Sequence, residues 1–273
     1  ERSPKASEHL KKHYKTFEEI KSQGLDALII SGANVSHPDL QRAPFYEQLK
    51  EVVEWSYENV TSTLCSCLAT HAVLEFKYGQ KRQPVGAKHW GVFPHNVVNR
   101  SHPLVKGVNT RFDIPHSRFN EISELQFAKA EVEILAKSSI GVHLAVSPDL
   151  FRIVFFQGHP EYDAISLLKE YKREVALYLE NNGTEYPPIP SNYLSLQSQA
   201  ILEEYRTKLD SKKASIADFP EALITNKLDN TWHDSANAII NNWIGCVYQI
   251  TNEDIAKPFM DGIDPNNPLK LKK

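Results

Sequence analysis

Three residue types that could form a nucleophilic site follow two apolar, strand-like segments. Cys67 comes directly after the β-branched segment 60–66, and His159 and Glu161 follow the apolar segment 151–157. A cysteine nucleophile needs a base to take its proton, and the imidazole needs a third group to fix its tautomer. The three residues are therefore candidates for these roles, although spacing alone also allows Cys67 to be a small buried apolar side chain.

The position of Cys67 between a strand and a helix favours a chemical role. A helical pattern begins at Leu68 and ends before Gly79, so Cys67 would lie at an abrupt strand-to-helix turn, where a helix N-terminus favours a thiolate. Cys65, inside the strand, and Cys246, on an apolar helix face, are interpreted as packing residues. An odd count of three cysteines indicates reduced thiols in a cytoplasmic protein.

Alternating strand and helix patterns predict the framework that positions these residues. The helical segments are 6–23, 44–58, 68–78, 162–181, 194–210 and 235–249. The strand-like segments are 25–30, 60–66, 85–98, 111–118, 132–137, 141–146 and 151–157. We predict an α/β fold with a mostly parallel, doubly wound sheet, flanking helices and a small antiparallel β insertion. Ligands of such sheets bind at the carboxyl ends of the strands.

Composition excludes several classes of partner. The 273 residues contain 31 Lys and Arg against 34 Asp and Glu, a net charge of −3, which lacks the basic excess of many nucleic-acid binders. The apolar stretches are far shorter than the roughly 18 residues of a membrane span. Residues 1–15 are polar and have no apolar signal segment. We therefore expect small-molecule partners, no nucleic acid, no membrane and no metal, with a homodimer left open.

Several segments resemble the homoserine O-acyltransferase family, also called the homoserine O-succinyltransferase family. The matching segments are DALIISGA (26–33), EWS (54–56), VTSTL (60–64) before Cys67, PHSR (115–118), GHPEYDA (158–164), NW (242–243) and VYQIT (247–251). They occur in the family order and cover most of the chain. The resemblance implies a class I glutamine amidotransferase-like fold.

The resemblance also implies an acyl-thioester mechanism. Cys67 would attack an acyl-coenzyme A, His159 would act as general base, and Glu161 would orient it. The acyl group would then pass to the hydroxyl of L-homoserine, a step toward methionine. Acyl-coenzyme A is a co-substrate in this scheme, and no bound cofactor is expected.

Further residues match positions that the family uses around its substrates. They are Lys88, Ser117 and Arg173, and Arg173 could bind the amino-acid carboxylate as a planar fork. The alternatives are solvated charges for Lys88 and Arg173 and a turn hydroxyl for Ser117. Backbone N–H groups near Val35 and Leu68 would fit an oxyanion hole.

Ser36 falls at the position linked in the family to the choice of acyl donor. Glycine there accompanies succinyl transfer and glutamate accompanies acetyl transfer. Serine is small and uncharged, so it would not repel the free carboxylate of a succinyl group. We therefore favour succinyl-CoA over acetyl-CoA. Acylation of serine would use the same three catalytic residues and stays open.

The chain also departs from the family pattern. We expect a single acyltransferase domain over 1–273 that lacks the family's opening strand segment. Leu68 and His71 replace an aromatic residue and a glutamine, and His71 could contact the thiol or be a buried structural histidine. Residues 194–230 form a long, charged insertion. Two alternatives follow: glutamine amidotransfer, and a catalytically silent relative that binds a metabolite or a partner chain.

Overall fold

A computed structural model describes residues 3–33, 35–181 and 185–272. Within them, seven strands form one sheet in the order β1-β2-β7-β6-β5-β3-β4. The strands are β1 (Ala27–Ile30), β2 (Ser62–Ser66), β3 (Gln83–Val97), β4 (Arg111–Glu121), β5 (Glu133–Ser138), β6 (Gly141–Val146) and β7 (Ile153–Phe156). The helices are α1 (Pro4–His13), α2 (Phe17–Gln23), α3 (Tyr46–Asn59), α4 (Leu68–Tyr78), α5 (Glu124–Lys129), α6 (Ser166–Glu180), α7 (Leu196–Asp210), α8 (Glu221–Thr225) and α9 (His233–Ile250).

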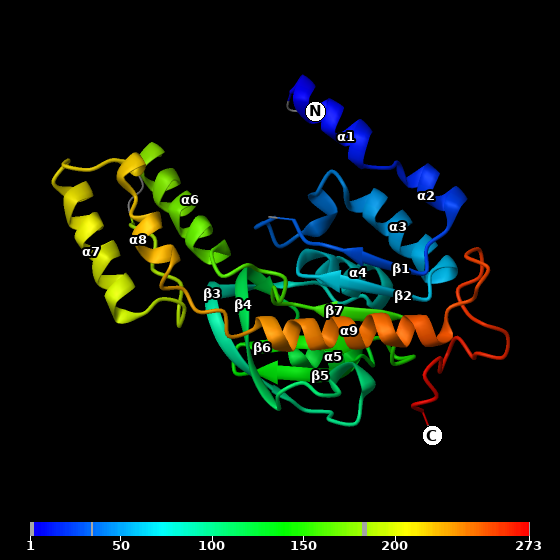
Figure 1. The fold of residues 1–273 in the computed structure, drawn as a ribbon. Coiled ribbons are helices and arrows are strands. Elements are labelled where there is room, and N and C mark those ends of the chain that lie inside the picture. The colour runs from blue at the N-terminus through cyan, green and yellow to red at the C-terminus, as the bar shows by residue number, and fades with distance from the viewer. Residues whose placement is uncertain (1–2, 34, 182–184, 273) are drawn as a thin grey trace.

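Helices cover both faces of the sheet, with α9 on one face and α3 and α4 on the other (Figure 1). Successive residues of β2 point to opposite faces. Leu64 packs in one core cluster with Ile239 of α9, whereas Cys65 packs in another with Val53 of α3 and Val73 of α4. Burial on both faces explains the nearly continuous apolar pattern of this strand.

The sheet is mixed rather than mostly parallel. The α/β class and the flanking helices are as expected, and β1, β2 and β7 run parallel. However, β6, β5, β3 and β4 pair antiparallel with their neighbours, so the antiparallel part is larger than a small insertion. Residues 139–140 alone join β5 to β6, and such a connection closes a hairpin but is too short for a parallel crossover.

The helical pattern of residues 6–23 is divided between α1 and α2. Thr16 begins α2 with a capping box. Its Oγ1 accepts a hydrogen bond from the Glu19 N–H at 3.3 Å, and its N–H donates to Glu19 Oε2 at 2.6 Å. This reciprocal pair satisfies backbone groups at the start of a second helix. The spacing of apolar residues continues through residues 6–23, so it does not reveal the break between α1 and α2.

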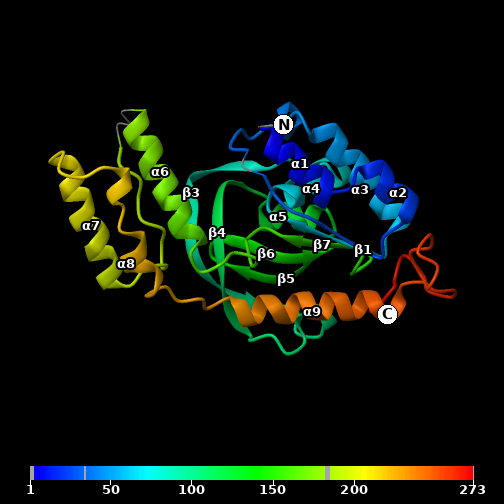
Figure 2. The same ribbon diagram turned by 45° about the horizontal axis from the view of Figure 1, so that its top comes forward.

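The charged segment 194–230 packs on α6. Helices α7 and α8 lie beside α6 in both views (Figures 1 and 2). Tyr205 meets the Phe219 ring edge-on at 5.4 Å, Phe219 lies 6.1 Å from the Tyr171 ring, and Lys172 forms an ion pair with Glu221 at 2.7 Å. One side of this charged segment is therefore part of the core and supports the helix that borders the site.

Candidate active site

The turn that carries Cys67 is strained and closely packed. Cys67 lies between β2 and α4 with a φ of 51° and a ψ of −111°, a positive φ that is uncommon for a residue with a side chain. Its N–H donates to the Phe156 carbonyl at 2.7 Å. A Cβ atom added to Gly32 would lie 3.0 Å from the Cys67 Cβ. These contacts hold the partly exposed Cys67 at the carboxyl ends of the parallel strands, as the sequence predicts.

His159 lies between Cys67 and Glu161. Its Nδ1 is 2.9 Å from Glu161 Oε1, which also accepts a hydrogen bond from Ser66 Oγ at 3.2 Å. Because the carboxylate accepts the Nδ1 proton, Nε2 is left for the Cys67 side chain, which hydrogen-bonds the ring. Tyr162 stacks on the imidazole with ring centroids 4.3 Å apart. The structure thus brings the three predicted residues together in the order cysteine, histidine, carboxylate.

Two opposing effects set the protonation of this group. Burial by itself would lower the pKa of His159, but the charge and hydrogen bond of Cys67, followed by those of Glu161, raise it to about 10. Burial would raise the pKa of Glu161, whereas contacts with His159, and a hydrogen bond from Ser66, hold it below its usual range. The site therefore favours an imidazolium between the sulfur and the carboxylate.

A cavity of about 280 Å³ opens beside His159. Its lining residues form two groups according to their contacts. The group around Glu170 and Glu174 of α6, which we call the α6 half, consists of Lys88, Ser117, Phe119, Tyr162, Glu170, Arg173 and Glu174. The group that includes His71 of α4, which we call the α4 half, consists of Val35, His71, Arg82, Arg118 and Asn120. The predicted residues Lys88, Ser117 and Arg173 gather in the α6 half.

Glu170 organises the α6 half and was not anticipated from the sequence. Its Oε2 accepts hydrogen bonds from Ser117 Oγ at 2.6 Å and from Trp90 Nε1 at 3.0 Å. Its Oε1 accepts one from the Tyr162 hydroxyl at 2.6 Å. The available signal was its position three residues before Arg173, which places both side chains on one helix face.

Lys88 and Arg173 both line the α6 half, and Lys88 is more buried than Arg173. Lys88 is mostly buried, with Nζ 3.8 Å from Glu174, 4.0 Å from Glu170 and 3.9 Å from the Trp90 ring centroid. Burial lowers the pKa of Lys88, and the two carboxylates oppose that change. Arg173 is half-exposed and bonds Glu174 at 3.4 Å. Lys88 is thus not a solvated charge, while Arg173 keeps donors at the mouth of the cavity.

Of the predicted oxyanion and donor-specificity positions, Val35 lines the α4 half, whereas Leu68 and Ser36 are not among the residues that line the cavity. The Leu68 N–H belongs to the first turn of α4, next to Gly32. The Val35 N–H is bonded to the Ala33 carbonyl at 3.1 Å, so it would have to give up that bond to serve an oxyanion. Ser36 is exposed, and its carbonyl accepts a hydrogen bond from Asn120 Nδ2 at 2.9 Å.

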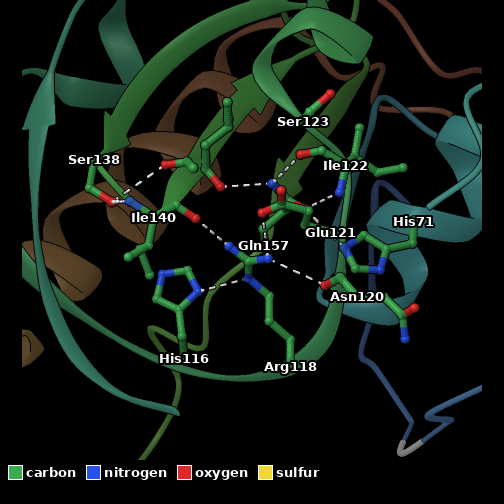
Figure 3. Close-up of polar contacts among 12 residues, drawn as sticks. His71, His116, Arg118, Asn120, Glu121, Ile122, Ser123, Ser138, Ile140 and Gln157 are labelled. Atoms are coloured by element: carbon green, nitrogen blue, oxygen red, sulfur yellow. Dashed lines mark hydrogen bonds and ion pairs between the residues drawn. The ribbon is translucent and has the colours of Figure 1, made fainter. Parts of the chain in front are cut away.

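A buried polar network fixes His71 in the α4 half (Figure 3). Gln157 donates through Nε2 to the Ile122 and Val142 carbonyls, and its Oε1 accepts from the Ile122 N–H. His71 Nε2, 3.0 Å from the same Oε1, must therefore donate, which leaves Nδ1 as an acceptor with no partner among the described residues. Burial, then Arg118 and Arg82, lower the pKa of His71 to about 3. This agrees with the structural interpretation of His71.

Arg118, the last residue of the PHSR segment, is enclosed by acceptors (Figure 3). Its Nε donates to His116 Nδ1 at 3.4 Å, Nη1 to Glu121 Oε2 at 3.1 Å, and Nη2 to the Ile140 carbonyl at 2.6 Å. The side chain thus ties β4 to the β5–β6 turn and keeps a paired positive charge behind the cavity.

Two further features concern the part of the chain that the structure describes. None of its helices combines the length and apolarity that crossing a membrane requires. No group of three or more His, Cys, Asp or Glu side chains in it could hold a metal ion.

The fold and the site together define an α/β protein in which a cysteine on a strand-to-helix turn is aligned with a histidine and a glutamate. The sequence profile of the homoserine O-succinyltransferase family matches residues 1–253, and the chain belongs to that family. It is 59% identical to a homoserine O-succinyltransferase of Nitrosococcus oceani and 58% identical to one of Thioalkalivibrio nitratireducens. These alignments cover all of this chain and 77% and 78% of the relatives.

Among solved structures, a glutamine amidotransferase from Methylobacillus flagellatus aligns with 88% of this chain and 86% of its own. The sequence identity is 16% and the TM-score is 0.48.

Proposed function

We propose that the chain transfers a succinyl group from succinyl-CoA to the hydroxyl of L-homoserine, a step toward methionine in the cytoplasm. The observation that carries the proposal is the alignment of Cys67, His159 and Glu161, with His159 2.9 Å from Glu161 and hydrogen-bonded to Cys67. His159 and Glu161 line the cavity. A sulfur in hydrogen-bond contact with a carboxylate-oriented imidazole suits attack on a thioester because the imidazole can take the thiol proton as the new bond forms.

In the first half-reaction, the Cys67 sulfur attacks the thioester carbonyl and forms a new S–C bond. The Leu68 N–H, at the start of α4, supports the oxyanion. The bond to the coenzyme A sulfur breaks, and the His159 imidazolium supplies the proton for that leaving group. The products are a succinyl-Cys67 thioester, free coenzyme A and a neutral His159.

In the second half-reaction, neutral His159 acts as the base. The acyl-cysteine has no negative charge, so the interaction that most raises the pKa of His159 is lost once the thioester forms. His159 then takes the proton of the homoserine hydroxyl while the hydroxyl oxygen attacks the acyl carbon. The S–C bond breaks, and the sulfur–imidazolium pair is restored. Glu161 keeps the ring oriented through both steps.

The α6 half suits the amino acid. Arg173 has donors at the cavity mouth for a carboxylate, and Glu170 and Glu174 carry negative charge for an ammonium group. Serine shares these two groups with homoserine and differs by one methylene, so it is the competing acceptor.

The test is product formation with purified protein, succinyl-CoA and L-homoserine, followed by mass spectrometry. We expect O-succinylhomoserine with the unsubstituted chain and with Cys246→Ala, which changes a cysteine far along the sequence on α9, and none with Cys67→Ala. Release of ammonia from glutamine would instead favour the amidotransferase alternative. Absence of both products would favour a silent relative.

A further inference from the structure

The α4 half of the cavity contains a cation that has no anionic partner. Four Lys and Arg side chains line the cavity: Arg82, Lys88, Arg118 and Arg173. Lys88 pairs with Glu170 and Glu174, Arg118 with Glu121, and Arg173 with Glu174. No carboxylate of the described residues lies within ion-pairing distance of Arg82. Glu75 acts on Arg82 only through a longer-range Coulombic attraction, which raises the pKa of the guanidinium.

The hydrogen bonds of Arg82 show which of its nitrogen atoms is free to bind a ligand. Its Nε donates to the Pro38 carbonyl at 3.1 Å, and its Nη2 donates to the carbonyls of Val35, at 2.8 Å, and His37. These bonds use the donors on two of its three nitrogens. The two N–H groups of Nη1 make no hydrogen bond among the described residues, although Arg82 is 5% exposed and lines the cavity. Nη1 is not among the enclosed side-chain nitrogens that lack a partner, so its two donors are open to an anionic ligand in the cavity.

Arg82 and Arg118 both place positive charge close to His71 and Cys67. Arg118 and Arg82 both contribute to lowering the pKa of His71, after the larger effect of burial. Both arginines also lie close enough to Cys67 to respond to its charge. An anionic group attached to an acyl chain on Cys67 would therefore be attracted toward this end of the cavity.

We propose that Arg82 binds the distal carboxylate of the acyl donor through Nη1 and so selects a dicarboxylic acyl group over an acetyl group. This inference rests on the proposed function and names the residue that would recognise the succinyl end. Arg82 also holds residues 35–38, the loop that carries Ser36.

The experiment compares succinyl-CoA with butyryl-CoA, whose acyl chain has the same number of carbons and no carboxylate. We expect Arg82→Gln to lower kcat/KM for succinyl-CoA about 10- to 100-fold, with a much smaller effect on butyryl-CoA. Arg82→Lys keeps the charge and should recover part of the succinyl preference. Arg100→Gln, which removes an exposed positive charge from the turn after β3, should leave the preference unchanged.

A role confined to holding the loop predicts a different result. Arg82→Gln would then lower the rates with both donors by the same factor, and this outcome would overturn the inference, as would unchanged rates with both. If the substituted chain turns over too slowly to assay, single-turnover acylation of Cys67 by each donor gives the same comparison. Failure of the unsubstituted chain to form any O-succinylhomoserine would overturn the proposed function itself. An unchanged preference for succinyl-CoA over butyryl-CoA in Arg82→Gln would overturn only the inference about Arg82.

Discussion

Nδ1 of His159 lies 2.9 Å from Oε1 of Glu161, and this contact determines which ring nitrogen faces Cys67. A carboxylate accepts a proton from Nδ1, so Nε2 is the atom that exchanges protons with the sulfur and with the substrates. Orientation of His159 therefore depends on a side chain two residues further along the same turn.

Replacing Glu161 should disrupt that orientation. Glu161→Gln keeps the shape but removes the charge that stabilises the imidazolium, and we expect kcat to fall at least about 100-fold. Steady-state kinetics would measure the loss, with Asp163→Asn as the control because Asp163 is an exposed acid close by in sequence. A kcat within a few-fold of the unsubstituted chain would show that Glu161 does not orient His159.

The charge of Cys67 should be visible in the titration of His159. The pKa of His159 is raised from 6.5 to about 10, in large part by Cys67, so between these pH values the ring is an imidazolium. In Cys67→Ala, burial still disfavours the charged ring, and the two largest contributions that raise its pKa are gone, so the pKa should fall back toward 6.5. NMR titration of the His159 ring in both proteins tests this, and identical titration curves would refute it.

Close packing around Gly32 should limit substitution there. A Cβ at this position would lie 3.0 Å from the Cys67 Cβ and 3.2 Å from the Leu68 nitrogen. We expect Gly32→Ala to displace the turn and slow acylation of Cys67 at least about tenfold. Gly86→Ala is the matched control, because an added Cβ there meets nothing within 4 Å. Equal acylation rates in the two variants, measured by rapid-quench mass spectrometry, would contradict the packing argument.

Gln157 should matter for stability. It is fully buried and makes hydrogen bonds to His71, Ile122 and Val142. In Gln157→Leu these groups lose their partner, and we expect the free energy of unfolding to fall by about 3 kcal/mol. Urea denaturation measures it. The exposed Gln48 provides the comparison: a change in Gln157→Leu no larger than in Gln48→Leu would mean that the network is not stabilising.

The predictable part of the site was the part controlled by local sequence. Cys67 directly follows one apolar strand pattern, His159 and Glu161 come within a few residues of another, and the carboxyl ends of neighbouring parallel strands meet at one edge. Helix α4 has the predicted bounds because its pattern starts after Cys67 and ends at Gly79, whose φ of 68° suits a helix terminus.

Contacts between distant segments were beyond local patterns. Glu170 meets Trp90 and Ser117 across 80 and 53 positions, and in the sequence it resembles any charged residue on a helix. Arg82 likewise bonds carbonyls that lie 44 to 47 residues earlier. Strand direction was also misjudged, because an apolar alternation predicts a strand but not its partner.

The most direct test of the central claim is the intact mass of the chain after mixing with succinyl-CoA in the absence of homoserine. The account predicts one added succinyl group, located by peptide mapping at Cys67, released as O-succinylhomoserine when L-homoserine is added, and absent in Cys67→Ala. Product formation with no acylated intermediate, or an adduct that persists in Cys67→Ala, would contradict it.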